Sequence, residues 1–161
     1  MDKETKKIFL IAILFLAFDQ ITKIIVRNSL VLAKEIIIIP NFFSLYYVEN
    51  TGAAFSSFMG QTIFLIVISI FCLGLILNLI RKEQNKTKLI NLSLGILLGG
   101  MIGNLMDRIF FQRVTDFLSF TFFKYHFPVF NIADIGITCG VALYLILSII
   151  KDINESKKEK K

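Results

Sequence analysis

Four long apolar stretches constrain the fold of this 161-residue chain more than any other feature. Residues 62–80 and 89–106 carry no charged side chain, and about 20 apolar residues suffice for a helix to cross a bilayer. Residues 8–18 and 135–150 are shorter apolar runs, so each span there also takes in neighbouring polar residues. With 55% hydrophobic residues, the sequence predicts an all-α integral membrane protein, with one four-helix membrane domain over residues 1–161. The expected spans cover about residues 8–26, 60–80, 89–107 and 132–150.

The basic side chains indicate how these helices are oriented. Of the 18 Lys and Arg residues, 12 lie before residue 8, between residues 81 and 88, or after residue 150. Short segments rich in Lys and Arg stay on the cytoplasmic side of a membrane. Both termini are therefore expected in the cytoplasm, and loops 28–58 and 109–131 on the other side. The net charge of +6 follows from this topology and suits anionic lipid rather than nucleic acid.

The two outer loops carry signals of their own. In the first, two β-rich runs at 36–39 and 42–48 flank the turn dipeptide Pro40-Asn41, which predicts a small extracytoplasmic hairpin at the membrane surface. The second holds nine aromatic residues between Phe110 and Phe130, and aromatic rings favour the headgroup region. This predicts an aromatic-rich surface loop, in which the alternation over 113–122 allows one further strand.

Glycines predict which helices approach each other. The third apolar segment has Gly95, Gly99 and Gly103 at spacings of four, and the fourth has Gly136 and Gly140. Small residues four apart form a groove that lets helix backbones come close in lipid. If these two helices touch near their outer ends, the loop after the third lies beside the start of the fourth. Two carboxyl groups, those of residues 116 and 134, are then brought together at the outer membrane boundary.

A constellation of polar residues is expected at that same depth, from four separate stretches of the chain. Ionisable groups at membrane depth are costly, so their default interpretation is functional, although scattered interfacial charges are the alternative. Two carboxylates held close together share one proton, as in aspartic proteases. Lys23 and Arg108 suit ion pairs with Asp19 and Asp107, and Gly52 permits unusual backbone conformations or an ordinary turn. The candidate site residues are Asp116 and Asp134, supported by Asp19, Lys23, Asn50, Gly52, Asn104, Arg108 and Asn131.

Other common chemistries lack their residues. GxSxG is absent, His126 is the sole histidine, and Cys72 and Cys139 are far apart within apolar spans. Serine or cysteine nucleophiles, a metal site and a disulfide framework are therefore not expected. No small-x-small cleavage site follows the first apolar run, so we interpret it as a retained span rather than a signal peptide.

Five short motifs follow one another across the chain. They are Asp19-Gln20-Ile21-Thr22-Lys23, Glu49-Asn50-Thr51-Gly52-Ala53-Ala54-Phe55, Gly99-Gly100-Met101-Ile102-Gly103-Asn104-Leu105-Met106-Asp107-Arg108, Val114-Thr115-Asp116-Phe117 and Phe130-Asn131-Ile132-Ala133-Asp134. In order and spacing they resemble the motif set of bacterial lipoprotein signal peptidase, the type II signal peptidase. The resemblance covers nearly the whole chain.

This resemblance implies an aspartyl endopeptidase of the bacterial cytoplasmic membrane, with the site on the extracytoplasmic face. It implies that Asp116 and Asp134 form the catalytic dyad. The expected substrates are prolipoproteins, cut just before a cysteine that bears a diacylglyceryl group. The resemblance further implies no metal or organic cofactor, membrane lipid as a partner, and inhibition by cyclic depsipeptides such as globomycin.

Three other functions compete with this interpretation. A proton-coupled transporter would place carboxylates near mid-membrane and show an internal repeat or broken helices, which the sequence lacks. An intramembrane protease of the presenilin type would carry GxGD, which is missing. A structural membrane subunit would use these polar residues merely to satisfy one another, and would tolerate Asn at both aspartates.

Overall fold

The computed structural model describes residues 2–52, 58, 60–123 and 125–159, and Ala53, Ala54 and Phe55 of the second motif fall outside this range. Its helices are α1 (Lys3–Ser29), α2 (Thr62–Lys82), α3 (Lys88–Phe111) and α4 (Ile132–Glu159). Its strands are β1 (Glu35–Ile39), β2 (Phe43–Asn50), β3 (Val114–Phe122) and β4 (Tyr125–His126). All four helices are long and apolar enough to cross a membrane, which confirms the predicted architecture.

Local caps explain why the helices run beyond the expected spans. The side chain of Asp2 accepts a hydrogen bond from the Thr5 backbone N–H at 2.7 Å, so α1 begins at its polar end rather than at residue 8. Thr87 caps α3 in the same manner. At the other end of α3, Gln112 adopts a left-handed conformation with φ of 60° and ends the helix. Apolar runs locate a span, whereas caps decide where the helix ends.

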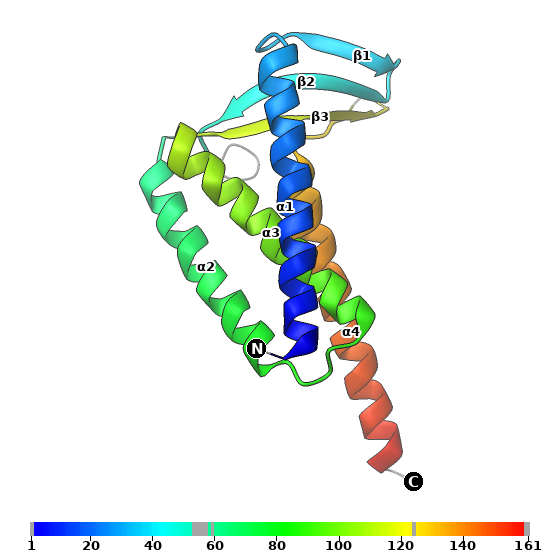
Figure 1. The fold of residues 1–161 in the computed structure, drawn as a ribbon. Helices are drawn as coiled ribbons and strands as arrows, with labels where there is room; N and C mark the ends of the chain where they lie inside the picture. Colours follow the sequence, from blue (N-terminus) through cyan, green and yellow to red (C-terminus); the bar gives the residue numbers. More distant parts are fainter. Residues whose placement is uncertain (1, 53–57, 59, 124, 160–161) are drawn as a thin grey trace.

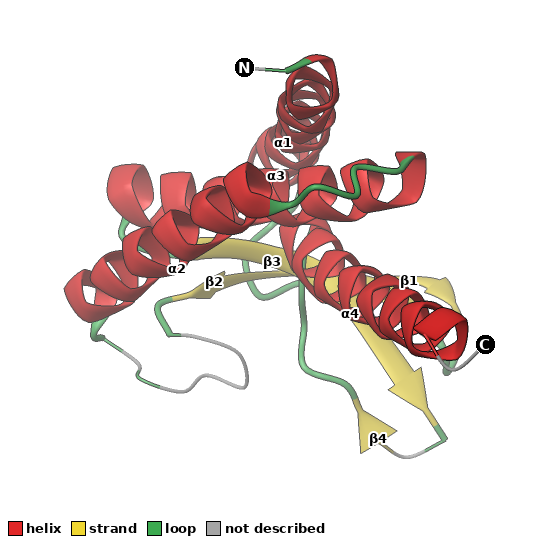
Figure 2. Cartoon of the chain, turned by 90° about the horizontal axis from the view of Figure 1, so that it is seen from below, coloured by secondary structure: helices red, strands yellow, loops and turns green. Residues whose placement is uncertain are grey.

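Helix α3 is the centre of the helical layer and packs against α1, α2 and α4 (Figures 1 and 2). A side chain at Gly100 or Gly140 would meet backbone of α4 or α3 respectively, which agrees with the expected approach of these helices. Gly95 and Gly99 instead face α1, where added Cβ atoms would lie 2.6 Å from Ile11 and from the Ala12 carbonyl oxygen. The groove formed by Gly95 and Gly99 therefore packs against α1. Residues four apart share one face of a helix, whereas Gly100 lies on a different face of α3, toward α4.

The four strands form an antiparallel sheet in the order β1-β2-β3-β4. Asn41, with φ of 57°, makes the turn between β1 and β2, and Val48 pairs with Asp116 across β2 and β3. The predicted hairpin and further strand are thus both present. Figure 1 shows β1, β2 and β3 lying across the end of the bundle that is opposite the N-terminus. Strand β3, which carries Asp116, contacts both α1 and α3.

Among the described residues, two clusters of buried apolar side chains join the elements. One cluster joins α1, α2 and α3 through Ile8, Ile80 and Leu94, and a second joins α1 to the sheet through Val26 and Phe117. Outward-facing side chains remain apolar: in α2, Ile63 is 78% and Phe71 65% exposed. A helix that is apolar on its exposed side needs lipid around it, as the four spans predict.

Candidate active site

Asp116 and Asp134 come together around one asparagine. Asp116 lies in β3 and is 3% exposed, and Asp134 lies half-buried in the first turn of α4. The Asn131 side chain donates to Asp116 Oδ1 at 2.6 Å, while the Asn131 backbone N–H donates to Asp134 Oδ2 at 3.1 Å. Residues that are 18 positions apart in the sequence thus share a hydrogen-bond donor residue.

Two further amides complete the surroundings of the carboxyl groups. Asn50 Nδ2 donates to Asp116 Oδ2 at 2.9 Å, and Asn104 Nδ2 donates to Asp134 Oδ1 at 2.7 Å. Each carboxyl group therefore accepts one hydrogen bond on each of its oxygens. Neutral amide donors hold a carboxylate in place without neutralising its charge.

Burial sets the proton affinity of Asp116. The pKa of this carboxyl group is raised to about 7, first because burial removes water from it and second because Asp134 adds a nearby negative charge. Hydrogen bonds from Asn50 and Asn131 act in the opposite direction. The carboxyl group of Asp116 can therefore exchange a proton near neutral pH.

A fully buried ionic cluster adjoins this site and is joined to it through Asn104. Lys23 Nζ is 2.9 Å from Asp19 Oδ2 and 3.1 Å from Asp107 Oδ2, and all three side chains are 0% exposed. The pair of Lys23 with Asp19 is the one that the sequence predicts. Asp19 Oδ1 also accepts the Ala133 backbone N–H at 2.8 Å, beside Asp134. Gly103 leaves room for this carboxylate, since an added Cβ would lie 2.5 Å from Asp19 Oδ2.

The expected pair of Arg108 with Asp107 is wrong. Within the described part of the chain, the ion pairs of Asp107 are with Lys23 and with Arg27, the latter at 3.7 Å. Arg108 instead donates to the carbonyl oxygens of Asn104 and Gly52, each at 3.3 Å. Asp107 is on the buried side of α3, where Gln20, Lys23 and Arg27 from α1 reach it. Arg108 instead contacts Gly52 of the second motif.

Gly52 and Glu49 have different places at the site. The Gly52 backbone N–H donates to Asn50 Oδ1 at 2.9 Å, so this glycine helps to orient an asparagine that contacts Asp116. Glu49 is not brought to the carboxyl pair, since it accepts from Tyr47 at 3.0 Å and pairs with Arg113 at 3.1 Å. Neighbouring residues of one strand point to opposite faces, which separates Glu49 from Asn50.

Sequence reasoning gave no role to two contacts that hold the site together. Gln20 Nε2 lies within 3.3 Å of the Asp19 carboxylate, the Gly103 carbonyl oxygen and the Asp107 carboxylate. The Thr115 backbone N–H donates to Asp107 Oδ2 at 3.2 Å and so fixes the start of β3. For Gln20, the sequence signal is its i,i+3 spacing from Lys23, which puts both side chains on one face of α1. The Thr115 contact comes from a backbone N–H group, which every residue except proline has, so no sequence pattern indicates it.

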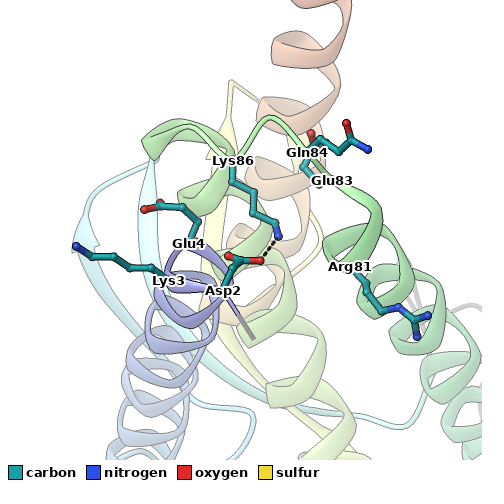
Figure 3. Close-up of a pocket in the computed structure, with 7 residues that line it drawn as sticks. All are labelled: Asp2, Lys3, Glu4, Arg81, Glu83, Gln84 and Lys86. Atoms are coloured by element: carbon teal, nitrogen blue, oxygen red, sulfur yellow. Dashed lines mark hydrogen bonds and ion pairs between the residues drawn. The ribbon is translucent and has the colours of Figure 1, made fainter.

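A separate cleft lies at the other end of the bundle, near the N-terminus (Figures 1 and 3). Its acidic and basic residues are equal in number, and Lys86 pairs with Asp2 at 2.8 Å. Its lining residues are Asp2, Lys3, Glu4, Arg81, Glu83, Gln84 and Lys86. Glu83 also accepts from Tyr144 at 2.8 Å. This cleft lies at the end of the bundle opposite the sheet, and it is not part of the site around the carboxyl pair. Among the described residues, no group of three or more His, Cys, Asp and Glu could hold a metal ion.

The fold and this site define a multi-pass membrane protein in which a carboxyl pair lies between a helical bundle and a small sheet. Residues 11–150 match the family model described as Signal peptidase (SPase) II. The "Lipoprotein signal peptidase" of Maridesulfovibrio salexigens is 43% identical over 89% of this chain and 94% of its own length. That of Symbiobacterium thermophilum is 42% identical, over 84% and 90%.

A solved structure agrees with these sequence relatives. A bacterial membrane enzyme superposes with a TM-score of 0.83 and 32% identity, covering 92% of this chain and 90% of the other. The chain belongs to the signal peptidase II family, and it is a peptidase.

Proposed function

We propose that this chain removes signal peptides from prolipoproteins by aspartyl catalysis, with Asp116 and Asp134 as the catalytic dyad. The observation that carries this proposal is the sharing of Asn131 by two carboxyl groups, one of which has a pKa of about 7. Family membership favours a peptidase over a proton-coupled transporter or a polar structural subunit. The whole chain acts as one four-helix membrane domain.

Peptide hydrolysis follows from one proton shared by the pair. The ionised carboxylate takes a proton from a water molecule, and the oxygen of that water forms a bond to the scissile carbonyl carbon. At the same time, the protonated carboxyl group gives its proton to the carbonyl oxygen. The tetrahedral intermediate then collapses and its C–N bond breaks. The amino group of the cysteine leaves with the proton that came from water, and the dyad is restored.

The substrate is a prolipoprotein whose cysteine carries a diacylglyceryl group, and cleavage occurs on the amino side of that cysteine. Lipid chains anchored in the bilayer hold the scissile bond at the membrane boundary, which is where a site between helices and sheet would meet it. Segments 28–58 and 109–131 are expected to cover the bound peptide, and residues 53–57 and 124 of these segments lie outside the described residues. Cyclic depsipeptides such as globomycin occupy the same site. Unchanged deuterium exchange in both segments on inhibitor binding would count against the cover.

Cleavage of a purified, diacylglyceryl-modified precursor tests the activity. The wild-type protein should cut the modified precursor and leave the unmodified one intact. Asp116→Asn and Asp134→Asn should each abolish cleavage while the protein still inserts and purifies, because each removes one member of the proton-sharing pair. Asp152→Asn is the matched control, since it removes an exposed carboxyl group on the terminal turns of α4. Appreciable turnover by either dyad variant would refute the assignment.

Topology is tested separately. We propose that both termini lie in the cytoplasm of a bacterium and that the sheet and the dyad lie on the extracytoplasmic side. In a chain with Cys72 and Cys139 replaced by Ser, a cysteine at Asn41 in the hairpin should react with an impermeant maleimide in intact cells. A cysteine at Gln84 should react only after the cells are opened. The reverse pattern would overturn the orientation.

A further inference from the structure

Three asparagine amides contact the carboxyl pair, and each presents its NH2 group to a carboxylate oxygen. An amide could also point its oxygen there, so something must fix its orientation. The oxygen of each amide faces a group that can only donate. Asn50 Oδ1 accepts the Gly52 N–H at 2.9 Å, Asn131 Oδ1 accepts the Asp134 N–H at 3.0 Å, and Asn104 Oδ1 accepts Lys23 Nζ at 2.9 Å. Rotating any of these amides by half a turn would set two donors against each other.

The donor on Asn104 differs in kind from the other two. The donors to Asn50 and Asn131 are backbone N–H groups. The donor to Asn104 is the buried side-chain ammonium group of Lys23, which is held by Asp19 and Asp107. A second donor, Asn131 Nδ2, also reaches Asn104 Oδ1, but at 3.2 Å and while donating to Asp116 at 2.6 Å. The shorter and charged contact from α1 is thus the principal restraint on the Asn104 amide.

We propose that Lys23 is a positioning residue for the dyad, which acts by holding the Asn104 NH2 group on Asp134. This inference rests on the proposed function. Without Lys23, the Asn104 amide can rotate and point its oxygen at the Asp134 carboxyl group. The amide oxygen and a carboxyl oxygen form a hydrogen bond only when that carboxyl group carries a proton. Lys23 therefore favours the ionised state of the pair without contacting it. The charged groups facing Asp134 are Asp116 from β3 and Arg108 from α3. Lys23 acts from α1 through Asn104, and its positive charge also favours the ionised form of Asp116 directly.

Removing Lys23 alone would confuse this role with a structural one. It would leave Asp19 and Asp107 buried without their cation, and an uncompensated buried charge is strongly destabilising. Asp107 also holds the Thr115 N–H at the start of β3. A useful variant must therefore remove the ammonium and one carboxylate together, so that the net charge of the buried cluster is unchanged.

The double variant Lys23→Met with Asp19→Asn meets that requirement, and Asp19→Asn alone is its matched control. Asn at position 19 can still accept the Ala133 N–H, and in the control Lys23 keeps its contacts with Asn104 and Asp107. For each protein, kcat/KM on the diacylglyceryl-modified precursor is measured from pH 5 to pH 9, and thermal unfolding verifies the fold. Absolute rates are not compared, since only the midpoints of the pH profile decide.

We expect the acidic midpoint of the double variant to lie about one pH unit above that of Asp19→Asn, the displacement that loss of one hydrogen bond to a charged group gives. Lys23→Gln with Asp19→Asn carries the same charge as the Met protein but restores a neutral donor to Asn104, so its midpoint should lie well below that of the Met protein and near the control value. Equal midpoints in the Met and control proteins would overturn the proposal, and so would equal midpoints in the Met and Gln proteins, which differ in the donor but not in charge. If the Met protein does not fold, Lys23→Leu with Asp19→Asn takes its place, because leucine also removes the donor to Asn104. Failure of the proposed function is distinguishable, because then wild type would not cleave or Asp134→Asn would.

Discussion

Replacing Asp116 with Asn should abolish cleavage, and the stability of the variant relative to wild type should increase as the pH rises toward 7. The folded-state pKa of Asp116 is about 7, against 3.8 for an aspartate side chain that is free in water. A carboxyl group with a raised pKa binds protons more tightly when the chain is folded. Its contribution to the free energy of unfolding is therefore complete below about pH 4, declines as the pH rises, and is lost above about pH 7.

The size of this effect follows from the shift. About three pKa units at about 1.4 kcal/mol each give a loss of about 4 kcal/mol between pH 4 and pH 7. Asparagine carries no charge at any pH, so the variant does not undergo this loss. The stability difference between Asp116→Asn and wild type should therefore grow by up to about 4 kcal/mol over that range, and stay constant at higher pH. For a chain of this size, each kcal/mol corresponds to about 2–4 °C in Tm.

Unfolding in detergent micelles at pH 4.5, 6 and 8 measures the difference. The chain contains no tryptophan, so far-ultraviolet circular dichroism is the suitable signal. Asp152→Asn serves as the control, because it removes the same charge from an exposed position and should show no growing difference. A stability difference for Asp116→Asn that does not change with pH would refute the reasoning, as would a variant that still cleaves its precursor.

Two further perturbations probe the packing and the hydrogen bonds of the site. Gly100→Ala puts a Cβ against the carbonyl oxygen of Ala133, the residue before Asp134, and should lower the free energy of unfolding by about 1–3 kcal/mol and also lower kcat/KM. Gly74→Ala is the control, because its Cβ meets open space. Equal unfolding and activity in the two proteins would contradict the packing argument. Asn50→Leu removes a hydrogen-bond donor from Asp116 and should raise the pKa of that carboxyl group further. The alkaline midpoint of the pH profile of kcat/KM should then move to higher pH. An unchanged or lowered midpoint would show that this hydrogen bond does not tune the pKa of Asp116.

Much of the fold is visible in local patterns. Apolar runs predict the four spans, because a lipid environment demands continuous apolar surface along a helix. The dipeptide Pro40-Asn41 predicts the hairpin, because proline and asparagine favour the backbone angles of a turn; Asn41 indeed has a positive φ. What these patterns miss is the choice of face. Gly95 and Gly99 pack on α1 rather than on α4, since a groove of small residues predicts close approach without naming the partner.

The candidate site divides in a similar manner. Sequence motifs identify the residues that gather around Asp116 and Asp134, and the i,i+4 spacing of Asp19 and Lys23 predicts their ion pair. The partner of Arg108 is not predictable in this way. Asp107 and Arg108 are adjacent on α3, yet Asp107 lies in the buried ionic cluster and Arg108 contacts Gly52. Their partners differ because α1 and the sheet pack against different sides of α3.

The sequence by itself determined that the chain crosses a membrane several times and which polar residues accompany the two aspartates, because lipid penalises each polar group and local spacing fixes short-range contacts. The tertiary structure alone decided that Asn131 joins both carboxyl groups and that Lys23 reaches Asn104 across 81 positions of the chain. Such contacts depend on the relative placement of helices and sheet, and that placement is set by packing summed over the whole molecule.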